Sequence, residues 1–147
     1  MKVQIARVNA HDTLPLPSYE TAGASGMDLR AVLGGEVWVP AGDKRTIPTG
    51  IRVAVPPGYE IQVRPRSGLA AKHMVTVLNT PGTIDSDYRG EIKVILANLS
   101  SAPFKVNHGD RIAQMVLCPV VHMELEMVED LPETARGAGG FGSTGAQ

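Results

Sequence analysis

The sequence predicts an all-β fold, a jelly-roll-like β-barrel or sandwich with one short helix and a glycine-rich C-terminal arm. Its 147 residues include 16 glycines and 11 prolines, about one and a half times the average share of these residues, beside 43% hydrophobic residues. Short apolar runs recur along the chain and turn-forming residues separate them, as is typical of many short strands. Only one short segment has the composition of a helix, which argues against a helical bundle.

The strands are predicted in chain order from alternation and from the residues that end it. Alternating apolar side chains indicate a strand within residues 3–8. The prolines of residues 14–17 prevent its ladder from continuing, because proline has no N–H to donate. Residues 31–39 predict two short strands joined by a tight hairpin at Gly34 and Gly35. Apolar runs at 47–55, 59–63, 75–78, 91–97 and 111–121 predict the remaining strands.

One helix is expected, at about residues 68–73. Ser67 is a good N-cap, since its hydroxyl can accept a hydrogen bond from an amide of the first turn, and the helix-favouring residues LAAKH follow. Cys118 lies in the apolar run MVLCPV, so we expect its side chain to pack in the core.

The chain is predicted to be a single domain with a C-terminal extension. Residues 1–123 would form the β core, residues 124–135 an acidic connector without lysine or arginine, and residues 136–147 a flexible glycine-rich arm. An acidic stretch of this kind is usually a solvated surface. The core itself is mildly basic, which is compatible with a small anionic ligand.

Composition argues against several functional classes. The formal net charge of −1 disfavours a protein that binds duplex DNA by neutralising phosphates. The polar, alternating N-terminus is unlike a signal peptide, and no apolar run could span a bilayer, so we expect a cytoplasmic protein with no membrane or nucleic-acid partner. The single cysteine and the four widely spaced histidines predict neither a disulfide framework nor a zinc site.

Two segments could bind an anion. In RPRSGLAAK (residues 64–72), arginines and Ser67 precede the predicted helix, whose unpaired N–H groups and dipole favour negative charge. In RGAGGFGSTG (residues 136–145), glycines let backbone amides approach an anion, Arg136 adds a guanidinium, and Phe141 offers a ring that could stack. The simpler alternatives are a capped helix with surface arginines and a disordered linker.

Two aspartates are candidates for chemistry. Asp85 follows Ile84 in a loop between two predicted strands, where it could act as a general base for water. Asp28, on a predicted strand, could orient a metal-bound water around a polyphosphate. The alternatives are a structural loop aspartate at residue 85 and, at residue 28, a buried aspartate paired with an arginine such as Arg30.

In their order along the chain, these segments resemble the homotrimeric all-β family of dUTPases (deoxyuridine triphosphatases). All five motifs of that family are present: AGASGMDLRA at 22–31, RSGLA at 66–70, GTIDSDYRGE at 82–91, GDRIAQM at 109–115 and RGAGGFGSTG at 136–145. The resemblance implies a jelly-roll subunit in a trimer whose active sites are each built from three chains. It implies hydrolysis of dUTP to dUMP and pyrophosphate with Mg²⁺, which keeps uracil out of DNA and supplies dUMP for thymidylate synthesis.

The resemblance also implies roles for single residues. Asp85 would activate the water that attacks the α-phosphorus, and Tyr88 would pack against the deoxyribose and exclude a ribose 2′-hydroxyl. Asn79, with backbone groups around Thr83, Ile84 and Lys93, would contact the uracil edge. The triphosphate and the exposed face of the base would be held by Arg66, Ser67, Gly68, Gln114, Arg136, Phe141, Gly142, Ser143 and Thr144. Asp28 would contact the metal through water only, since the triphosphate would hold most of the Mg²⁺ coordination.

Two other functions remain open at this point. A deoxycytidine triphosphate deaminase would share the trimeric fold but needs an acid/base carboxylate at position 4 of the base, and the GTIDSDYRG loop with the complete arm favours the hydrolase. A nucleotide-binding module without catalysis would not need Asp85.

Overall fold

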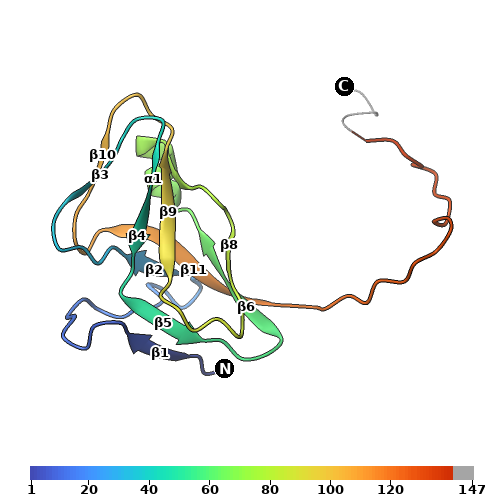
Figure 1. Ribbon diagram of the computed structural model, residues 1–147, viewed down its shortest axis with the longest axis horizontal. Helices are drawn as coiled ribbons and strands as arrows, with labels where there is room; N and C mark the ends of the chain where they lie inside the picture. The colour runs from blue at the N-terminus through green and yellow to red at the C-terminus, as the bar shows by residue number, and fades with distance from the viewer. Residues whose placement is uncertain (141–147) are drawn as a thin grey trace.

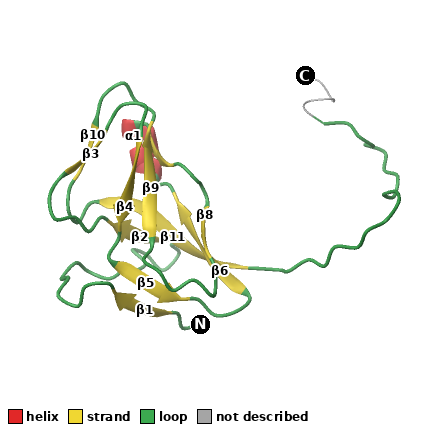
Figure 2. Cartoon of the chain, viewed as in Figure 1, coloured by secondary structure: helices red, strands yellow, loops and turns green. Residues whose placement is uncertain are grey.

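In the computed structural model, which describes residues 1–140, short strands form four small sheets around one apolar core (Figure 1). A single short helix accompanies them in this part of the chain (Figure 2). The elements are β1 (Gln4–Arg7), β2 (Met27–Arg30), β3 (Val37–Val39), β4 (Lys44–Pro48), β5 (Ile51–Ala54), β6 (Tyr59–Arg64), α1 (Ser67–His73), β7 (Val75–Val77), β8 (Gly82–Ile84), β9 (Lys93–Asn98), β10 (Phe104–Val106) and β11 (Arg111–Pro119).

All of the strand pairs are antiparallel. The largest sheet has the order β2-β11-β6-β8, and a second sheet has the order β4-β9-β7. Two-stranded ribbons, β1-β5 and β10-β3, complete the arrangement. Most partners are distant in sequence, as expected for a jelly-roll-like sandwich. Within residues 1–140 the sheets do not close into a barrel, so the all-β sandwich alternative of the prediction is confirmed.

Alternate residues of the strands build the core. Ile61 and Val63 of β6 face inward, as do Val94 and Leu96 of β9, and all four are buried. Their neighbours in sequence point to the other face of the sheet, because side chains alternate along a strand. Burial of each aliphatic side chain of this size contributes about 1.5–3 kcal/mol. The apolar runs that predicted these strands are therefore the source of the core.

The predicted hairpin at Gly34 and Gly35 is wrong. Residues 31–33 form no strand, because their amides bond to three separate partners: Ala31 N–H to the carbonyl of Asp110, Val32 N–H to that of Pro48, and Leu33 N–H to Nδ1 of His108. Strand β3 pairs instead with the distant β10. A two-residue turn signal is local, and here tertiary pairing overrides it.

Helix α1 also differs from its prediction at its start. Ser67 is the first helical residue, and the N-cap is Arg66, whose backbone is extended with φ −93° and ψ 128°. The side chain at the cap makes no capping hydrogen bond. The carbonyl of Arg66 accepts the N–H groups of Leu69 and Ala70 instead, each at 3.1 Å. This leaves the hydroxyl of Ser67 uncommitted to capping.

Cys118 does not lie in the core as predicted. It pairs with Glu60 across the β11–β6 ladder, on the sheet face opposite to the core side chain of Ile61. Its thiol is half-buried, and Nη2 of Arg64 lies 3.5 Å from the sulfur. The alternation of β11 thus turns this side chain toward polar neighbours.

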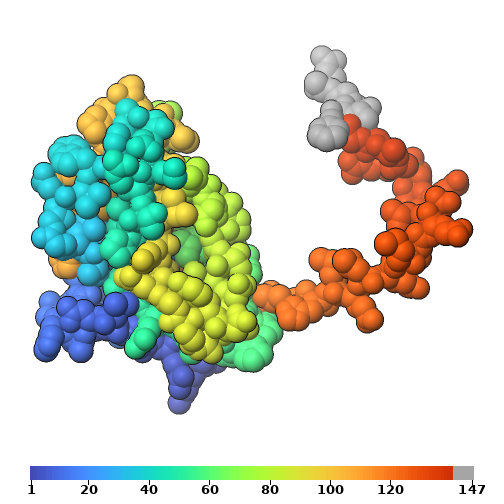
Figure 3. All heavy atoms as spheres, viewed as in Figure 1, coloured from blue at the N-terminus to red at the C-terminus, as the bar shows by residue number. Residues whose placement is uncertain are grey.

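After β11 the chain leaves the body. Residues 120–140 contain no strand or helix, and they run away from the core as an extended segment (Figure 3). Several apolar side chains of this segment are almost fully exposed, among them Val121 at 92% and Met127 at 96%. Among the described residues, no helix has the length and apolar character needed to cross a membrane.

Candidate active site

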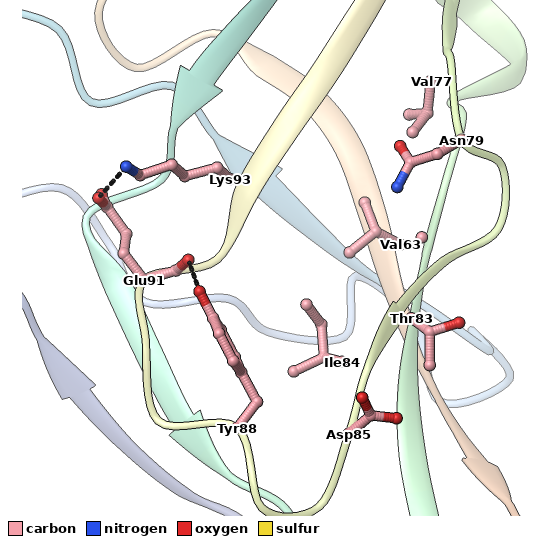
Figure 4. Close-up of a pocket in the computed structure, with 10 residues that line it drawn as sticks. Val63, Val77, Asn79, Thr83, Ile84, Asp85, Tyr88, Glu91 and Lys93 are labelled. Atoms are coloured by element: carbon pink, nitrogen blue, oxygen red, sulfur yellow. Dashed lines mark hydrogen bonds and ion pairs between the residues drawn. The ribbon is translucent and has the colours of Figure 1, made fainter.

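A pocket of about 330 Å³ opens between β8 and the beginning of β9, and we call it the hairpin pocket (Figure 4). It combines an apolar back wall with a polar rim. Its lining residues are Val63, Val77, Asn79, Gly82, Thr83, Ile84, Asp85, Tyr88, Glu91 and Lys93. The structure therefore brings together all of the residues predicted to meet the uracil edge, the sugar and the attacking water.

The back of the hairpin pocket is fixed by the pairing of β6 with β8, which sets Val63 opposite Gly82. Gly82 is buried, and a Cβ at this position would lie 3.3 Å from Nδ2 of Asn79 and 3.4 Å from Cβ of Val63. The glycine thus makes room for the amide of Asn79 beside the strand. An amide offers a donor and an acceptor side by side, which suits recognition of a base edge.

Asp85 lies at the rim of the pocket, immediately after β8. A turn follows it, in which the N–H of Tyr88 donates to the carbonyl of Asp85 at 3.2 Å. The carboxylate is exposed, and within residues 1–140 it has no hydrogen-bond or ion-pair partner. A carboxylate that is free in this way can accept a proton from a bound water molecule.

Tyr88 stands across the pocket from Asp85 (Figure 4). Its hydroxyl donates to the carbonyl of Glu91 at 3.0 Å, while 43% of the residue remains exposed. The ring lies against Gly90, where an added Cβ would fall 2.9 Å from Cε2 of the tyrosine and still closer to its hydroxyl end. The glycine is required for this orientation, which turns one ring face toward the pocket.

A second group of predicted residues gathers around Asp28, and we call Asp28, Arg66 and Arg111 the arginine cluster. Nε of Arg66 lies 2.8 Å from Oδ1 of Asp28, and Nη1 of Arg111 lies 3.3 Å from Oδ2. Arg30, the partner suggested from sequence, donates instead to the carbonyl of Gly109 at 2.9 Å. Asp28 is thus a paired aspartate, but its arginines come from two other segments of the chain.

The arginine cluster lies at the beginning of α1. Arg66 is the N-cap of the helix, Ser67 and Gly68 are exposed, and no atom lies within 4 Å of a Cβ placed on Gly68. A shallow cavity of about 260 Å³ beside it is lined by Arg66, Leu69, Phe104, Asp110, Arg111 and Ile112. Two guanidinium groups share one carboxylate here, so the cluster retains net positive charge suited to an anion.

Gln114 joins the helix start to the large sheet. Its Nε2 donates to the carbonyl of Pro65 at 2.9 Å. Its Oε1 lies so near to Gly26 that a Cβ on this glycine would approach to 2.6 Å. Gly26 and Gln114 belong to two different sequence motifs, and a side chain at residue 26 would displace the amide end of the glutamine.

The two groups of residues do not form one pocket in a single chain. None of Asp28, Arg66, Ser67, Gly68 or Gln114 lines the hairpin pocket. Arg136 also lies apart: it is exposed on the extended segment, and its Nε donates to the carbonyl of Gly139 at 2.8 Å. The predicted residues Phe141, Gly142, Ser143 and Thr144 lie outside the described part of the chain.

Comparison with known proteins decides the family. A family model described as dUTPase matches residues 12–145. The chain belongs to the dUTPase family. It is 54% identical over 147 residues to the deoxyuridine 5′-triphosphate nucleotidohydrolase of Maricaulis maris (strain MCS10), covering 99% of this chain and 97% of that protein. It is 52% identical over 145 residues to the protein of the same name from Rhizobium etli (strain CIAT 652), covering 97% and 93%.

Solved structures agree with the dUTPase fold. A mutant dUTPase of Staphylococcus bacteriophage 80alpha with dUpNHpp superposes with a TM-score of 0.86 at 22% identity, covering 99% of each chain. A mutant dUTPase of phage phi11 of S. aureus, described for the coordination of a structural Mg(II) ion, gives 0.79 at 21% identity, covering 90% of this chain and 100% of that one. At these identities the similarity concerns the fold.

Two residues of the candidate site lie within the sequence motifs, but the sequence predicts no role for them. Arg111, in GDRIAQM, completes the arginine cluster. Glu91, in GTIDSDYRGE, lines the hairpin pocket and accepts the N–H of Gly50 at 2.9 Å. Their motif membership was the available signal, whereas their partners are distant in sequence and only the fold brings them close.

A divalent cation is implied by the dUTPase family, and the donor set fits it only in part. Within residues 1–140, no three side chains of histidine, cysteine, aspartate or glutamate come together as a metal site. Both oxygens of Asp28 already accept hydrogen bonds from arginines. Each carboxylate oxygen can accept a second hydrogen bond, so Asp28 fits a metal-bound water rather than the metal itself.

Proposed function

We propose that this protein hydrolyses dUTP to dUMP and pyrophosphate by attack of water on the α-phosphorus. The observation that carries the proposal is the hairpin pocket, which holds an amide, a tyrosine ring and a carboxylate without a partner among residues 1–140 around one nucleoside-sized space in a member of the dUTPase family. Relatives at 54% and 52% identity bear the name of this activity. The reaction would keep uracil out of DNA and supply dUMP for thymidylate synthesis.

The base and the sugar are assigned to the hairpin pocket. The Asn79 amide and the backbone groups near Thr83, Ile84 and Lys93 read the uracil edge through complementary donors and acceptors. This type of recognition rejects cytosine strongly, because a mismatched edge leaves buried polar groups unpaired. Tyr88 lies against the deoxyribose, where a 2′-hydroxyl would collide with its ring.

Asp85 is assigned as the general base. It accepts a proton from water, and the resulting nucleophile attacks the α-phosphorus as the bond to the β-phosphate oxygen breaks and pyrophosphate leaves. Base catalysis of this kind contributes about 10²–10⁴-fold to a rate. Phosphoryl transfer otherwise depends on positioning and on charge stabilisation, which accounts for the lack of a nucleophilic serine or cysteine in the assignment.

The triphosphate is assigned to the arginine cluster side of the site. Arg66, Ser67 and Gly68 offer a guanidinium, a hydroxyl and backbone amides, and Gln114 adds an amide. Residues of the arm (Arg136, Phe141, Gly142, Ser143 and Thr144) complete the binding of phosphate and base. Mg²⁺ carried by the triphosphate would neutralise phosphate charge, with Asp28 hydrogen-bonded to one of its water ligands.

Assembly as a homotrimer with shared active sites is part of the proposal. The hairpin pocket and the cavity beside the arginine cluster share no lining residue in one chain, which supports a site completed by a pocket and an arginine cluster from different copies. The connector supports this as well. Residues 121–127 alternate apolar and polar side chains, a pattern typical of a strand with one buried face, yet they have no partner strand in the described part of this chain. The division into a core of residues 1–123, a connector of residues 124–135 and an arm of residues 136–147 remains part of the proposal.

The test is release of pyrophosphate from dUTP, dTTP, dCTP and UTP with Mg²⁺ and after chelation. We expect release from dUTP alone and its loss with chelator. Release at background level from all four would overturn the proposal. Formation of a uridine nucleotide from dCTP with its triphosphate intact would instead identify a deaminase.

A further inference from the structure

The loop that carries Tyr88 is fastened to the body of the protein at one end by a set of short hydrogen bonds. Both the Oγ1 and the N–H of Thr49 donate to the carbonyl of Ile92, at 2.6 and 3.3 Å, and the N–H of Ile92 donates to the carbonyl of Ile51 at 2.9 Å. These bonds attach residue 92 to the β4–β5 turn. The attachment is buried at Thr49 and Ile92, so water does not compete for it.

Glu91 extends this attachment toward the pocket through its side chain. Oε1 of Glu91 accepts the N–H of Gly50 at 2.9 Å, and its Oε2 lies 3.9 Å from Nζ of Lys93. Gly50 is buried with φ +68°, and its carbonyl is already occupied by the N–H of Val8 at 2.8 Å. The carboxylate is the acceptor for this buried N–H, and hydrogen bonds to a charged acceptor are the stronger kind.

Tyr88 depends on the backbone of the same glutamate. Its hydroxyl donates to the carbonyl of Glu91 (Figure 4). Its ring lies against Gly90. The other hydrogen bonds of the loop are internal: Nη1 of Arg89 donates to the carbonyls of Ser86 and Tyr88. The position of the Tyr88 hydroxyl is thus fixed by the carbonyl of Glu91, and Glu91 is in turn fixed by its bond to Gly50, which lies outside the loop.

We propose that Glu91 is a positioning residue for Tyr88 and thereby controls discrimination between deoxyribose and ribose nucleotides. The inference rests on the proposed function, in which the ring of Tyr88 excludes a 2′-hydroxyl. A shift of the carbonyl of Glu91 moves the acceptor of the tyrosine hydroxyl, and the ring follows it away from the sugar. Glu91 lines the hairpin pocket, but the role proposed for its side chain is to hold the N–H of Gly50 rather than to contact substrate.

Three substitutions of Glu91 separate the effect of the length of its side chain from the effect of its charge. Glu91→Gln keeps an acceptor at the same distance from Gly50 but removes the charge. Glu91→Asp keeps the charge, but its side chain is one methylene too short to reach the N–H of Gly50. Glu91→Ala removes both. The measurement is kcat/KM for dUTP and for UTP with each variant, accompanied by the thermal unfolding midpoint.

We expect Glu91→Asp and Glu91→Ala to lower the dUTP/UTP ratio of kcat/KM by about tenfold or more, since small displacements in a site carry effects of this size. Most of the change should be a gain for UTP. Glu91→Gln should keep the wild-type ratio within about threefold. Thr49→Val is the matched control: it removes one bond of the same attachment while the N–H bond to Ile92 remains, so it should lower the unfolding midpoint and leave the ratio unchanged.

The outcomes distinguish this inference from the proposed function. Unchanged ratios in Glu91→Asp and Glu91→Ala, with the wild-type enzyme active on dUTP, would overturn the role of Glu91 alone. Equal loss for dUTP and UTP would assign Glu91 to stability only and would also overturn it. If Glu91→Ala does not fold, the dUTP/UTP ratios of kcat/KM of Glu91→Asp and Glu91→Gln decide whether Glu91 has the proposed role. A wild-type protein inactive on dUTP would refute the proposed function first.

Discussion

The guanidinium of Arg66 and the carboxylate of Asp28 join the start of α1 to strand β2, with Nε and Oδ1 2.8 Å apart. The two residues are separated by 38 positions in sequence. Arg111 occupies the other carboxylate oxygen at 3.3 Å, so a single aspartate orients two arginines. Both side chains of the closer pair are largely withdrawn from solvent, at 27% and 17% exposed, which makes the contact stronger than an ordinary surface ion pair.

Asp28→Asn should therefore disturb both the helix start and substrate binding. The amide keeps one acceptor but loses the charge, and we expect the free energy of unfolding to fall by about 1–2 kcal/mol. The KM for dUTP should rise by about tenfold, because Arg66 is no longer held in place. Urea unfolding and steady-state kinetics measure the two effects. Asp43→Asn is the control: its 3.0 Å contact with Arg45 is exposed, so the free energy of unfolding should fall less, and Asp43 lines neither the hairpin pocket nor the cavity beside the arginine cluster, so the KM should not change. An Asp28→Asn protein with normal KM would show that Arg66 needs no such anchor.

Asp85→Asn should bind dUTP but hardly turn it over. The substitution keeps the size of the side chain and removes its ability to take a proton, so kcat should fall by about 10²-fold or more. Binding of a non-hydrolysable imido analogue of dUTP, measured by calorimetry, should remain near the wild-type value. Asp87→Asn provides the comparison, because Asp87 lies in the same turn but does not line the hairpin pocket. A variant at residue 85 with nearly normal kcat would place the base elsewhere.

Deletion of residues 136–147 should leave a folded protein of unchanged oligomeric state with little activity. Within residues 1–140 the buried core contains no residue from position 136 onward, so we expect the core to persist without the arm. Arg136 supplies a guanidinium in the proposed site, and loss of a good electrostatic donor costs about 10²–10³-fold in rate. Light scattering measures the oligomeric state, the unfolding midpoint measures folding, and the rate of pyrophosphate release measures activity. Full activity of the truncated chain would make the arm a linker.

Trp38 should report the protonation of Glu36 by its fluorescence. Hydrogen bonds from Lys105 and then from the indole N–H of Trp38 lower the pKa of Glu36 from its ordinary value of 4.5, and the charge of Lys105 adds to this. The stabilisation by this contact is therefore present above the ordinary pKa and is lost as the pH falls through the lowered value. Emission of the single tryptophan should stay constant from pH 7 to 5 and change below pH 4.5. Glu36→Gln should abolish this titration; a transition that persists in it would belong to another group.

The fold class was predictable because the signals behind it are local. Proline and glycine interrupt the apolar runs, and strands β5, β7 and β11 fall within the predicted runs, whereas β6 and β9 each extend one residue beyond theirs. The pairing of these strands was not predictable in the same way. The Gly34 and Gly35 hairpin fails because β3 finds its partner in β10, more than 60 residues away. Ser67 resembles an N-cap in composition, but the extended backbone of Arg66 takes that position.

In the candidate site, too, features carried by local sequence were predictable, whereas contacts between distant segments were not. The hairpin pocket lies largely in one continuous motif, so Asp85, Tyr88 and Lys93 could be grouped from their order in the chain. The partners of Asp28 come from α1 and β11, and sequence proximity pointed instead to Arg30. Glu91 went unassigned because its partner, Gly50, is a backbone amide in another turn, which no residue pattern reveals.

The separation of the hairpin pocket from the arginine cluster on one chain also has a genetic meaning. If sites are completed between copies, a chain with an inactivating substitution in its hairpin pocket still supplies an intact arm and arginine cluster to the sites of neighbouring chains. Two inactive variants, one lacking Asp85 and one lacking the arm, can then restore some working sites when their chains are mixed. The same geometry means that one defective chain lowers the activity of the assembly that it joins. The effect of a mutant allele therefore depends on which other chains its product assembles with.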